Sequence, residues 1–211
     1  MSNSPPATKA DAIGVLVLEE FACFEAVSLI EFICRSKEYK PNLYIRWRDS
    51  STRPEGGFKS HYGRCDIVAQ GQSIDLHLFD LPMSLLPDFN LSDLIFPVEI
   101  RGCLLLANRQ FSRMSENGTT TWPKKRYPGW LKWIQAQKIT FLVAVTGSDS
   151  SVLTVDKFRN FLGLKPGIKV VETHSHVTTN LHHVFEMTEA KQILTTLVES
   201  VLTNAPGTSD A

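Results

Sequence analysis

The chain has 211 residues, and its 22 lysines and arginines balance its 22 aspartates and glutamates, so the net charge is zero. Apolar residues make up 43% of the sequence, which is ordinary for a soluble globular protein with a substantial core. A chain without a cationic excess is a poor candidate for binding nucleic acid, because broad phosphate contacts need that excess. No apolar run is long enough to span a membrane and the N-terminus carries no secretory signal, so we expect a cytoplasmic protein.

The two ends of the chain differ from its interior. Residues 1–10 and 204–211 are rich in proline and in small or polar residues, so neither end can bury much apolar surface. We therefore expect two flexible tails around a single domain that spans residues 11–203.

The cysteines also favour an intracellular protein. Cys23, Cys34, Cys65 and Cys103 lie in apolar surroundings, and no two of them have a CxxC spacing. This pattern indicates reduced, mostly buried thiols rather than structural disulfides or zinc knuckles.

The first elements of the interior read as a strand, a helix and a loop. Residues 13–18 (IGVLVL) form a continuous apolar run of strand length, which suits a strand buried on both faces. Apolar residues then recur at helical spacing over residues 24–34. The polar, glycine-containing stretch 48–60 predicts a flexible loop.

The middle of the chain is rich in strand patterns. Residues 66–69 and 74–79 predict two strands paired around the turn 70–73. Residues 98–107, with CLLLA at the centre, predict another buried strand, and residues 139–145 (ITFLVAV) give the clearest strand pattern in the chain.

Helical patterns return in the last third. Thr154 is placed to cap a short helix that ends at Gly163, and residues 168–172 predict a further strand. An apolar stripe with spacing i, i+3, i+4 and i+7 predicts a final helix over residues 187–202.

Strands that alternate with helices predict an α/β fold with a mostly parallel central sheet and helices on both faces. Ligands of such sheets bind at the carboxyl ends of the strands. The loops that follow Leu18, Phe79 and Val145 are therefore the places where we expect a site.

Three segments, read together, carry a resemblance to a known family. They are IGVLVLEEFACFEAVSLIEFI, HYGRCDIVAQGQSIDLHLFDLP, and ITFLVAVTGSDSSVLTVDKFRNFLGL followed by IKVVETHS. Their order resembles the Ras-like small GTPases, most closely the bacterial Mgl-type branch of gliding-motility and cell-polarity GTPases. The resemblance covers about residues 11–203 and implies a three-layer, G-domain-like fold.

The phosphate-binding motif of that family is degenerate in this chain. The family's GxxxxGK[ST] loop cradles phosphates with backbone N–H groups, its lysine and its Mg²⁺ ligand. Here Glu25 stands at the lysine position and Ala26 at the Mg²⁺-ligand position, and bulky Phe24 occupies the loop. Glu20 adds a further carboxylate where phosphates would bind. At an effective dielectric of about 20, charges roughly 4 Å apart interact by about 4 kcal/mol, so this reversal of sign is costly to a bound phosphate.

The other two nucleotide motifs keep one residue each. Asp80 matches the aspartate of the family's DxxG, but Met83 replaces its glycine and Ser84 replaces the catalytic glutamine. Asp149 alone matches the family's NKxD. The alternative interpretation is that Asp80 and Asp149 each cap a turn at a strand end.

The resemblance therefore implies a pseudoGTPase that is not an enzyme and holds no cofactor. We expect a protein–protein interaction module in a polarity, motility or signalling assembly, and its partner to be a roadblock-fold dimer or a true small GTPase. The degenerate pocket is lined by Glu20, Phe24, Glu25, Asp80 and Asp149. The expected partner-binding face consists of Met83, Ser84, Leu85, Leu86, Phe89 and Trp130.

Two other functions stay open. One is a switch protein that binds GTP or GDP with Mg²⁺ through an unorthodox phosphate site, with Lys124–Arg126 supplying the cations. The other is a structural subunit that only stabilises a larger complex.

Two local compositions have both a functional and a structural interpretation. Residues 122–133 hold three of the four tryptophans and four cations, which suits a protein or anionic-lipid contact, or simple inward packing of Trp130 and Trp133. His174, His176 and His182 suit a metal site or, as we favour, a polar surface loop.

Overall fold

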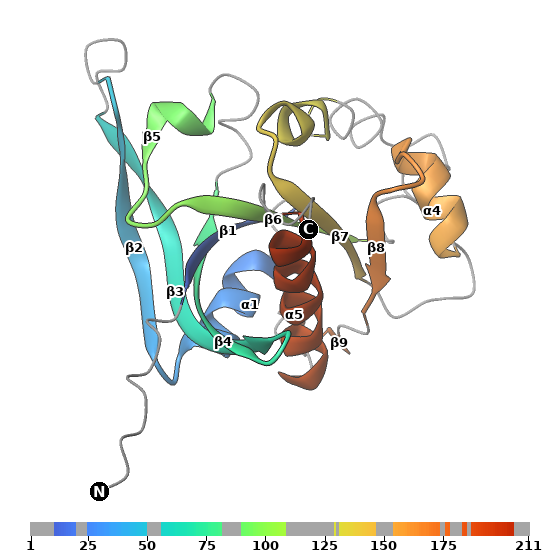
Figure 1. The fold of residues 1–211 in the computed structure, drawn as a ribbon, viewed down its shortest axis with the longest axis horizontal. Helices are drawn as coiled ribbons and strands as arrows, with labels where there is room; N and C mark the ends of the chain where they lie inside the picture. Colours follow the sequence, from blue (N-terminus) through green and yellow to red (C-terminus); the bar gives the residue numbers. More distant parts are fainter. Residues whose placement is uncertain are drawn as a thin grey trace, which may run out of the picture.

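The computed structural model describes residues 11–19, 25–49, 56–81, 90–108, 129, 131–146, 154–173, 176–177, 183–184 and 187–204. These residues form an α/β fold with few helices around one large mixed β-sheet (Figure 1). The expected tails, 1–10 and all but the first residue of 204–211, lie outside the described residues.

Strands dominate the order of elements along the described chain. The first half contains β1 (Ala12–Glu19), α1 (Glu25–Cys34), β2 (Glu38–Trp47), β3 (Gly57–Ala69) and β4 (Gln72–Asp80). The middle contains the 3-10 helix η2 (Leu91–Asp93), β5 (Leu94–Ile95), β6 (Ile100–Asn108), helical residues 131–136 and β7 (Thr140–Thr146). The last part contains α4 (Val155–Leu162), β8 (Lys169–Glu172), β9 (His176–Val177), β10 (His183–Val184) and α5 (Met187–Thr203).

The large sheet has eight strands in the order β5-β2-β3-β4-β1-β6-β7-β8. Pairing is parallel from β4 through β1, β6 and β7 to β8. It is antiparallel between β2 and β3, between β3 and β4, and between β2 and β5. The prediction of a mostly parallel sheet therefore describes one half and is wrong for the other, which is an antiparallel meander.

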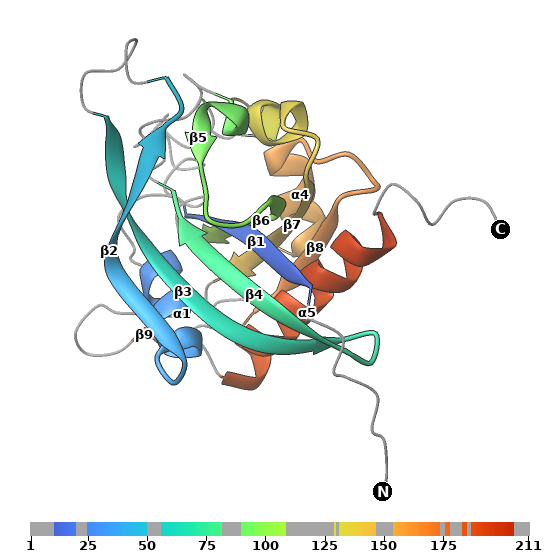
Figure 2. The same ribbon diagram turned by 60° about the vertical axis from the view of Figure 1, so that its left-hand side comes forward.

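The central strand β1 is buried on both faces, as its apolar run predicts. Ile13, Val15 and Val17 point into one core, whereas Leu16 and Leu18 point into the other. Helices α1 and α5 lie side by side over the first core, as Figures 1 and 2 show, and helical residues 131–136 contribute to the second. The expectation of helices on both faces is thus confirmed.

The predicted loop over residues 48–60 is too long. Strand β2 occupies residues 38–47, for which no strand was expected, and β3 already begins at Gly57. Sheet pairing stabilises β2, although its sequence contains a proline and several charges. Only its last part, with buried Ile45 and Trp47, has the apolar alternation of a strand.

Local chemistry explains several boundaries that the sequence does predict. The β3–β4 turn is closed by Gln70 and Gly71, whose φ angles are 50° and 75°, as a two-residue hairpin turn requires. The Thr154 side chain accepts a hydrogen bond from the Lys157 amide at 3.4 Å, and Gly163 ends α4 in the left-handed conformation.

Candidate functional site

The carboxyl ends of the parallel strands meet at one edge of the sheet. Strands β1, β4, β6, β7 and β8 end at Glu19, Asp80, Asn108, Thr146 and Glu172. The loops after Leu18, Phe79 and Val145 therefore leave the sheet at the same edge, where ligands of α/β sheets bind.

Two residues of the sequence-predicted pocket lie in the described part of the chain. Asp80 is the last residue of β4 and is partly exposed, and Glu25 is the first residue of α1. Glu20, Phe24 and Asp149 lie outside the described residues. The structure therefore fixes the backbone positions of Asp80, on the strand that pairs with β1, and of Glu25, on the helix that follows β1.

The expected partner-binding residues also fall outside the described ranges. They follow β4 or precede the helical residues 131–136, and they are Met83, Ser84, Leu85, Leu86, Phe89 and Trp130. Trp133, from the same tryptophan-rich segment, is 4% exposed and belongs to the second core. For Trp133 the interpretation as an inward-packed core residue is confirmed.

Polar side chains of β2 and β3 lie beside Asp80 at this edge. The Ser60 hydroxyl donates to the Asp80 main-chain oxygen at 2.7 Å, which ties β3 to the end of β4. Nearby, the Tyr39 hydroxyl lies 2.9 Å from His61 Nδ1, and the two rings stack. Burial raises the pKa of Tyr39, and the negative charges of Glu31 and Asp80 raise it further.

His61 adds no positive charge to this edge at neutral pH. Burial lowers the pKa of His61, against an opposing effect of Glu31. The imidazole is therefore neutral at physiological pH, and the ionised groups that act on the Tyr39–His61 pair are carboxylates.

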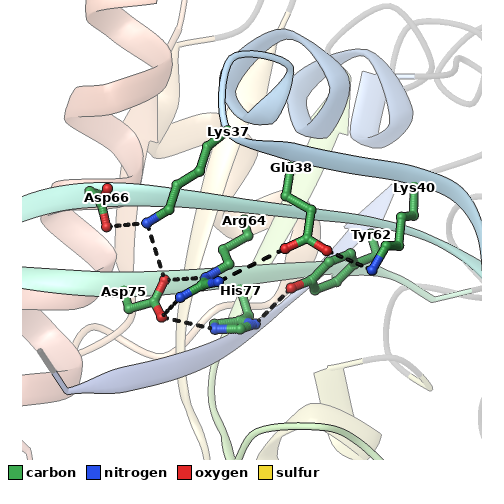
Figure 3. A network of polar contacts seen from close by, with 8 residues as sticks. All are labelled: Lys37, Glu38, Lys40, Tyr62, Arg64, Asp66, Asp75 and His77. Atoms are coloured by element: carbon green, nitrogen blue, oxygen red, sulfur yellow. Dashed lines mark hydrogen bonds and ion pairs between the residues drawn. The ribbon is translucent and has the colours of Figure 1, made fainter. Parts of the chain in front are cut away.

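A second polar cluster, which the sequence did not predict, lies on the antiparallel half of the sheet (Figure 3). It occupies the sheet face opposite to that of the Tyr39–His61 pair. Its centre is a two-pronged ion pair in which Arg64 Nε and Nη2 donate to the Asp75 carboxylate at 2.8 and 2.7 Å. The side chain of Asp75 is only 14% exposed. Arg64 holds the pKa of Asp75 at about 2, well below its usual range.

The cluster extends from Asp75 through His77 to the buried Tyr62. His77 Nε2 lies 3.4 Å from the Asp75 carboxylate, and His77 Nδ1 lies 3.0 Å from the Tyr62 hydroxyl. Such a relay resembles the carboxylate–imidazole–hydroxyl order of catalytic triads. However, Tyr62 is 5% exposed, and burial raises its pKa to about 12. The hydroxyl is therefore protonated and shielded, which suits a structural relay and not a nucleophile.

The outer part of the cluster is exposed to solvent. Lys37 contacts Asp66 at 2.5 Å and Asp75 at 3.6 Å, and Lys40 contacts Glu38 at 2.6 Å. The sequence signal that could have revealed the cluster is the alternation of polar and apolar residues along β3 and β4. In the part of these strands that forms the cluster, polar residues occupy every second position. That signal is visible only once the antiparallel register, which pairs Asp66 with Asp75, is known.

A shallow hollow of about 430 Å³ lies beside the segment that precedes β6. The Arg48 guanidinium borders it and donates to the Ser92 carbonyl at 2.9 Å. The other lining residues are Leu91, Leu94, Phe96, Pro97, Val98, Glu99 and Ile100. Its described lining offers one cation and one carboxylate, without a nucleophile and base in contact.

Histidines 176 and 183 pair their backbones across the small β9–β10 sheet, each opposite a valine. His174 and His182 lie outside the described residues. Within the described part of the chain, no three histidine, cysteine or acidic side chains are grouped closely enough to hold a metal ion.

Comparison with known proteins gives no assignment, since no protein-family model and no curated protein matches the sequence. None of the helices in the described ranges combines the length and the apolar character needed to cross a membrane. The function is therefore inferred from the residues and their geometry.

Proposed function

We propose that this chain is a pseudoGTPase: a small-GTPase-like α/β domain without GTP hydrolysis that acts as a protein–protein interaction module. The observation that carries the proposal is that β1, β4 and β8 end in the carboxylate residues Glu19, Asp80 and Glu172 at one edge of the sheet. The charges of Glu31 and Asp80 raise the pKa of Tyr39, and Glu20 and Glu25 occur in the loop and helix start that follow β1.

The order of elements supports the proposed fold. The central strand β1 is followed by α1, which packs over the same face as α5, and the meander β2–β3–β4 pairs with β1 through β4. This arrangement agrees with the paired strands that the resemblance implies after the first helix. It also leaves the three nucleotide-motif loops at one edge, where they would surround a bound nucleotide.

The electrostatics of that edge support the loss of triphosphate binding. A P-loop stabilises phosphates with a lysine and with backbone N–H groups that approach closely through glycine. The first cation after β1 is Arg35, which follows the last residue of α1. A nucleotide at this edge would therefore meet carboxylates without the family's compensating lysine.

A protein fixed in one state can still bind the partners of its switching relatives. We propose that the partner is a roadblock-fold dimer or a true small GTPase, and that Met83–Leu86, Phe89 and Trp130 form the contact. Apolar and aromatic residues of this kind dominate the energetic centres of protein interfaces.

The test is binding to a purified roadblock-fold dimer encoded in the same genome, measured by biolayer interferometry. We expect Leu86→Asp and Phe89→Asp to weaken binding by at least about tenfold, the effect of a hot-spot loss near 1.4 kcal/mol. Val68→Asp is the matched control, because Val68 is 67% exposed and lies at the far end of β3.

Unchanged affinity in both substituted proteins would contradict the proposed interface. Equal weakening by Val68→Asp would also contradict it, since the effect would then not be local to that face.

A further inference from the structure

Two thiols face each other between α1 and β3. Cys34 is the last residue of α1, Cys65 lies in β3, and both belong to the same core cluster. Cys34 is fully buried and Cys65 is 7% exposed.

A glycine lets the helix approach the strand at this point. Gly63 precedes Cys65 by two residues, so both positions face α1. A Cβ atom on Gly63 would lie 2.6 Å from both the Cβ and the Sγ atoms of Cys34. Cys34 therefore lies directly against β3, on the face that carries Cys65.

The two thiols also differ in character. The side-chain hydrogen bond between them lowers the pKa of Cys65, and the charge of Lys37 adds to this effect, whereas burial and the Asp66 and Asp75 carboxylates oppose it. The same hydrogen bond, together with burial, raises the pKa of Cys34. Cys65 is also the more exposed of the two, since Cys34 is fully buried, so Cys65 is the thiol that a peroxide reaches first.

We propose that Cys34 and Cys65 are a site of oxidative modification, at which a hydroperoxide converts the two facing thiols into a disulfide that links α1 to β3. This inference is independent of the proposed pseudoGTPase function, because it uses neither the carboxyl edge of the sheet nor a partner.

The chemistry balances with the hydroperoxide as the only oxidant. The Cys65 thiolate attacks one peroxide oxygen, the O–O bond breaks, and Cys65 becomes a sulfenic acid while water, or an alcohol, leaves. Cys34 then attacks the Cys65 sulfur, the S–O bond breaks, and water leaves as the S–S bond forms. Two thiols lose two electrons, and one peroxide bond gains them.

Cys103 provides an internal control. It is fully buried in β6 within the second core cluster, where it is the only cysteine among the described residues. Burial raises the pKa of Cys103, and no second thiol contributes to that shift. Among the described residues of its core cluster, Cys103 therefore lacks the resolving thiol that each member of the Cys34–Cys65 pair has.

The experiment treats the folded full-length protein with hydrogen peroxide, blocks remaining thiols by alkylation and maps the peptides by mass spectrometry. Trypsin cleaves after Arg64, and a glutamate-specific protease cleaves at Glu25 and Glu31, so peptides with Cys23 and Cys34 are separated. We expect a Cys34–Cys65 crosslinked peptide that dithiothreitol removes. Cys34 and Cys65 should lose alkylatable thiol together, at least about tenfold faster than Cys103.

Substitution identifies the pair. Cys34→Ser and Cys65→Ser should each abolish the crosslink, whereas Cys103→Ser should leave it unchanged. Circular dichroism before oxidation tests whether each variant is folded. If a variant is not folded, the peptide map of the wild-type protein alone decides whether the Cys34–Cys65 disulfide forms. Free Cys34 and Cys65 after treatment, or a disulfide that joins either of them mainly to Cys23 or Cys103, would overturn the proposal.

Discussion

Asp75 illustrates how a charged side chain is accommodated on a largely covered sheet face. Its carboxylate receives two hydrogen bonds from Arg64 and lies near the cations of Lys37 and, when protonated, His77. A buried or half-buried carboxylate is tolerated when each oxygen has a partner. The ion pair joins β3 to β4 diagonally: Arg64 of β3 lies opposite His77 of β4 and reaches Asp75, two residues before His77.

Removing this charge should lower stability in a pH-dependent way. We expect Asp75→Asn to reduce the free energy of unfolding by about 1–2 kcal/mol near neutral pH. The expected loss is modest because solvent around the partly exposed Arg64 weakens the ion pair. The folded-state pKa of Asp75 is about 2, below its unfolded value, so the ionised form stabilises the fold above pH about 4. That contribution is lost as the pH falls toward about 2.

Urea unfolding of wild type and variant across this acid range measures the difference. Asp66→Asn is the control, because Asp66 is 57% exposed and contacts only Lys37 among the ion pairs described, so its cost should stay below about 0.5 kcal/mol. A gap between wild type and Asp75→Asn that persists unchanged at the lowest pH would contradict the role given to the ionised carboxylate.

At the scale of elements, close approach between α1 and β3 decides the shape of the first core. Gly63 has no room for a side chain, because an added Cβ would meet Cys34 at 2.6 Å and Ile30 at 2.7 Å. Both neighbours are fully buried in the packed core, so neither can move away freely.

We therefore expect Gly63→Ala to destabilise the protein by about 1–3 kcal/mol through overpacking. Gly167→Ala is the matched control, since a Cβ there meets nothing within 4 Å and should change stability by no more than about 0.5 kcal/mol. Thermal unfolding followed by circular dichroism gives both values. Equal stability of the two variants would mean that α1 and β3 do not pack as closely as described.

Sequence patterns predict elements well where one local signal dominates. The continuous apolar run of β1, the capped ends of α4 and the buried stripe of α5 all lie where the patterns place them. Strand β2 was missed because Pro41 and its charged residues resemble a loop, and sheet pairing with β3 overrides that local preference. The Tyr62–His77–Asp75 relay was missed for a related reason, since register and not sequence proximity brings it together.

At the scale of the whole molecule, the sequence predicts the existence of strands better than it predicts whether neighbouring strands pair in parallel or antiparallel. The alternation of strands and helices correctly favours an α/β sheet, but the meander that precedes β1 in the sheet order is antiparallel. Parallel order from β4 to β8 nevertheless places the three loops of interest at one edge. Of the predicted site, the described residues fix Asp80 and the start of α1, and the other predicted side chains stay predictions.

The measurement that bears most directly on the pseudoGTPase proposal is a calorimetric titration of the purified protein with GTP, GDP and ATP, each with Mg²⁺. The acidic edge predicts no binding heat at about 100 μM protein, because the family's phosphate-binding lysine is replaced by a carboxylate. Micromolar or tighter binding of any of these nucleotides would contradict the proposal. The chain would then be a nucleotide-binding switch whose phosphate site draws its cations from outside the first loop.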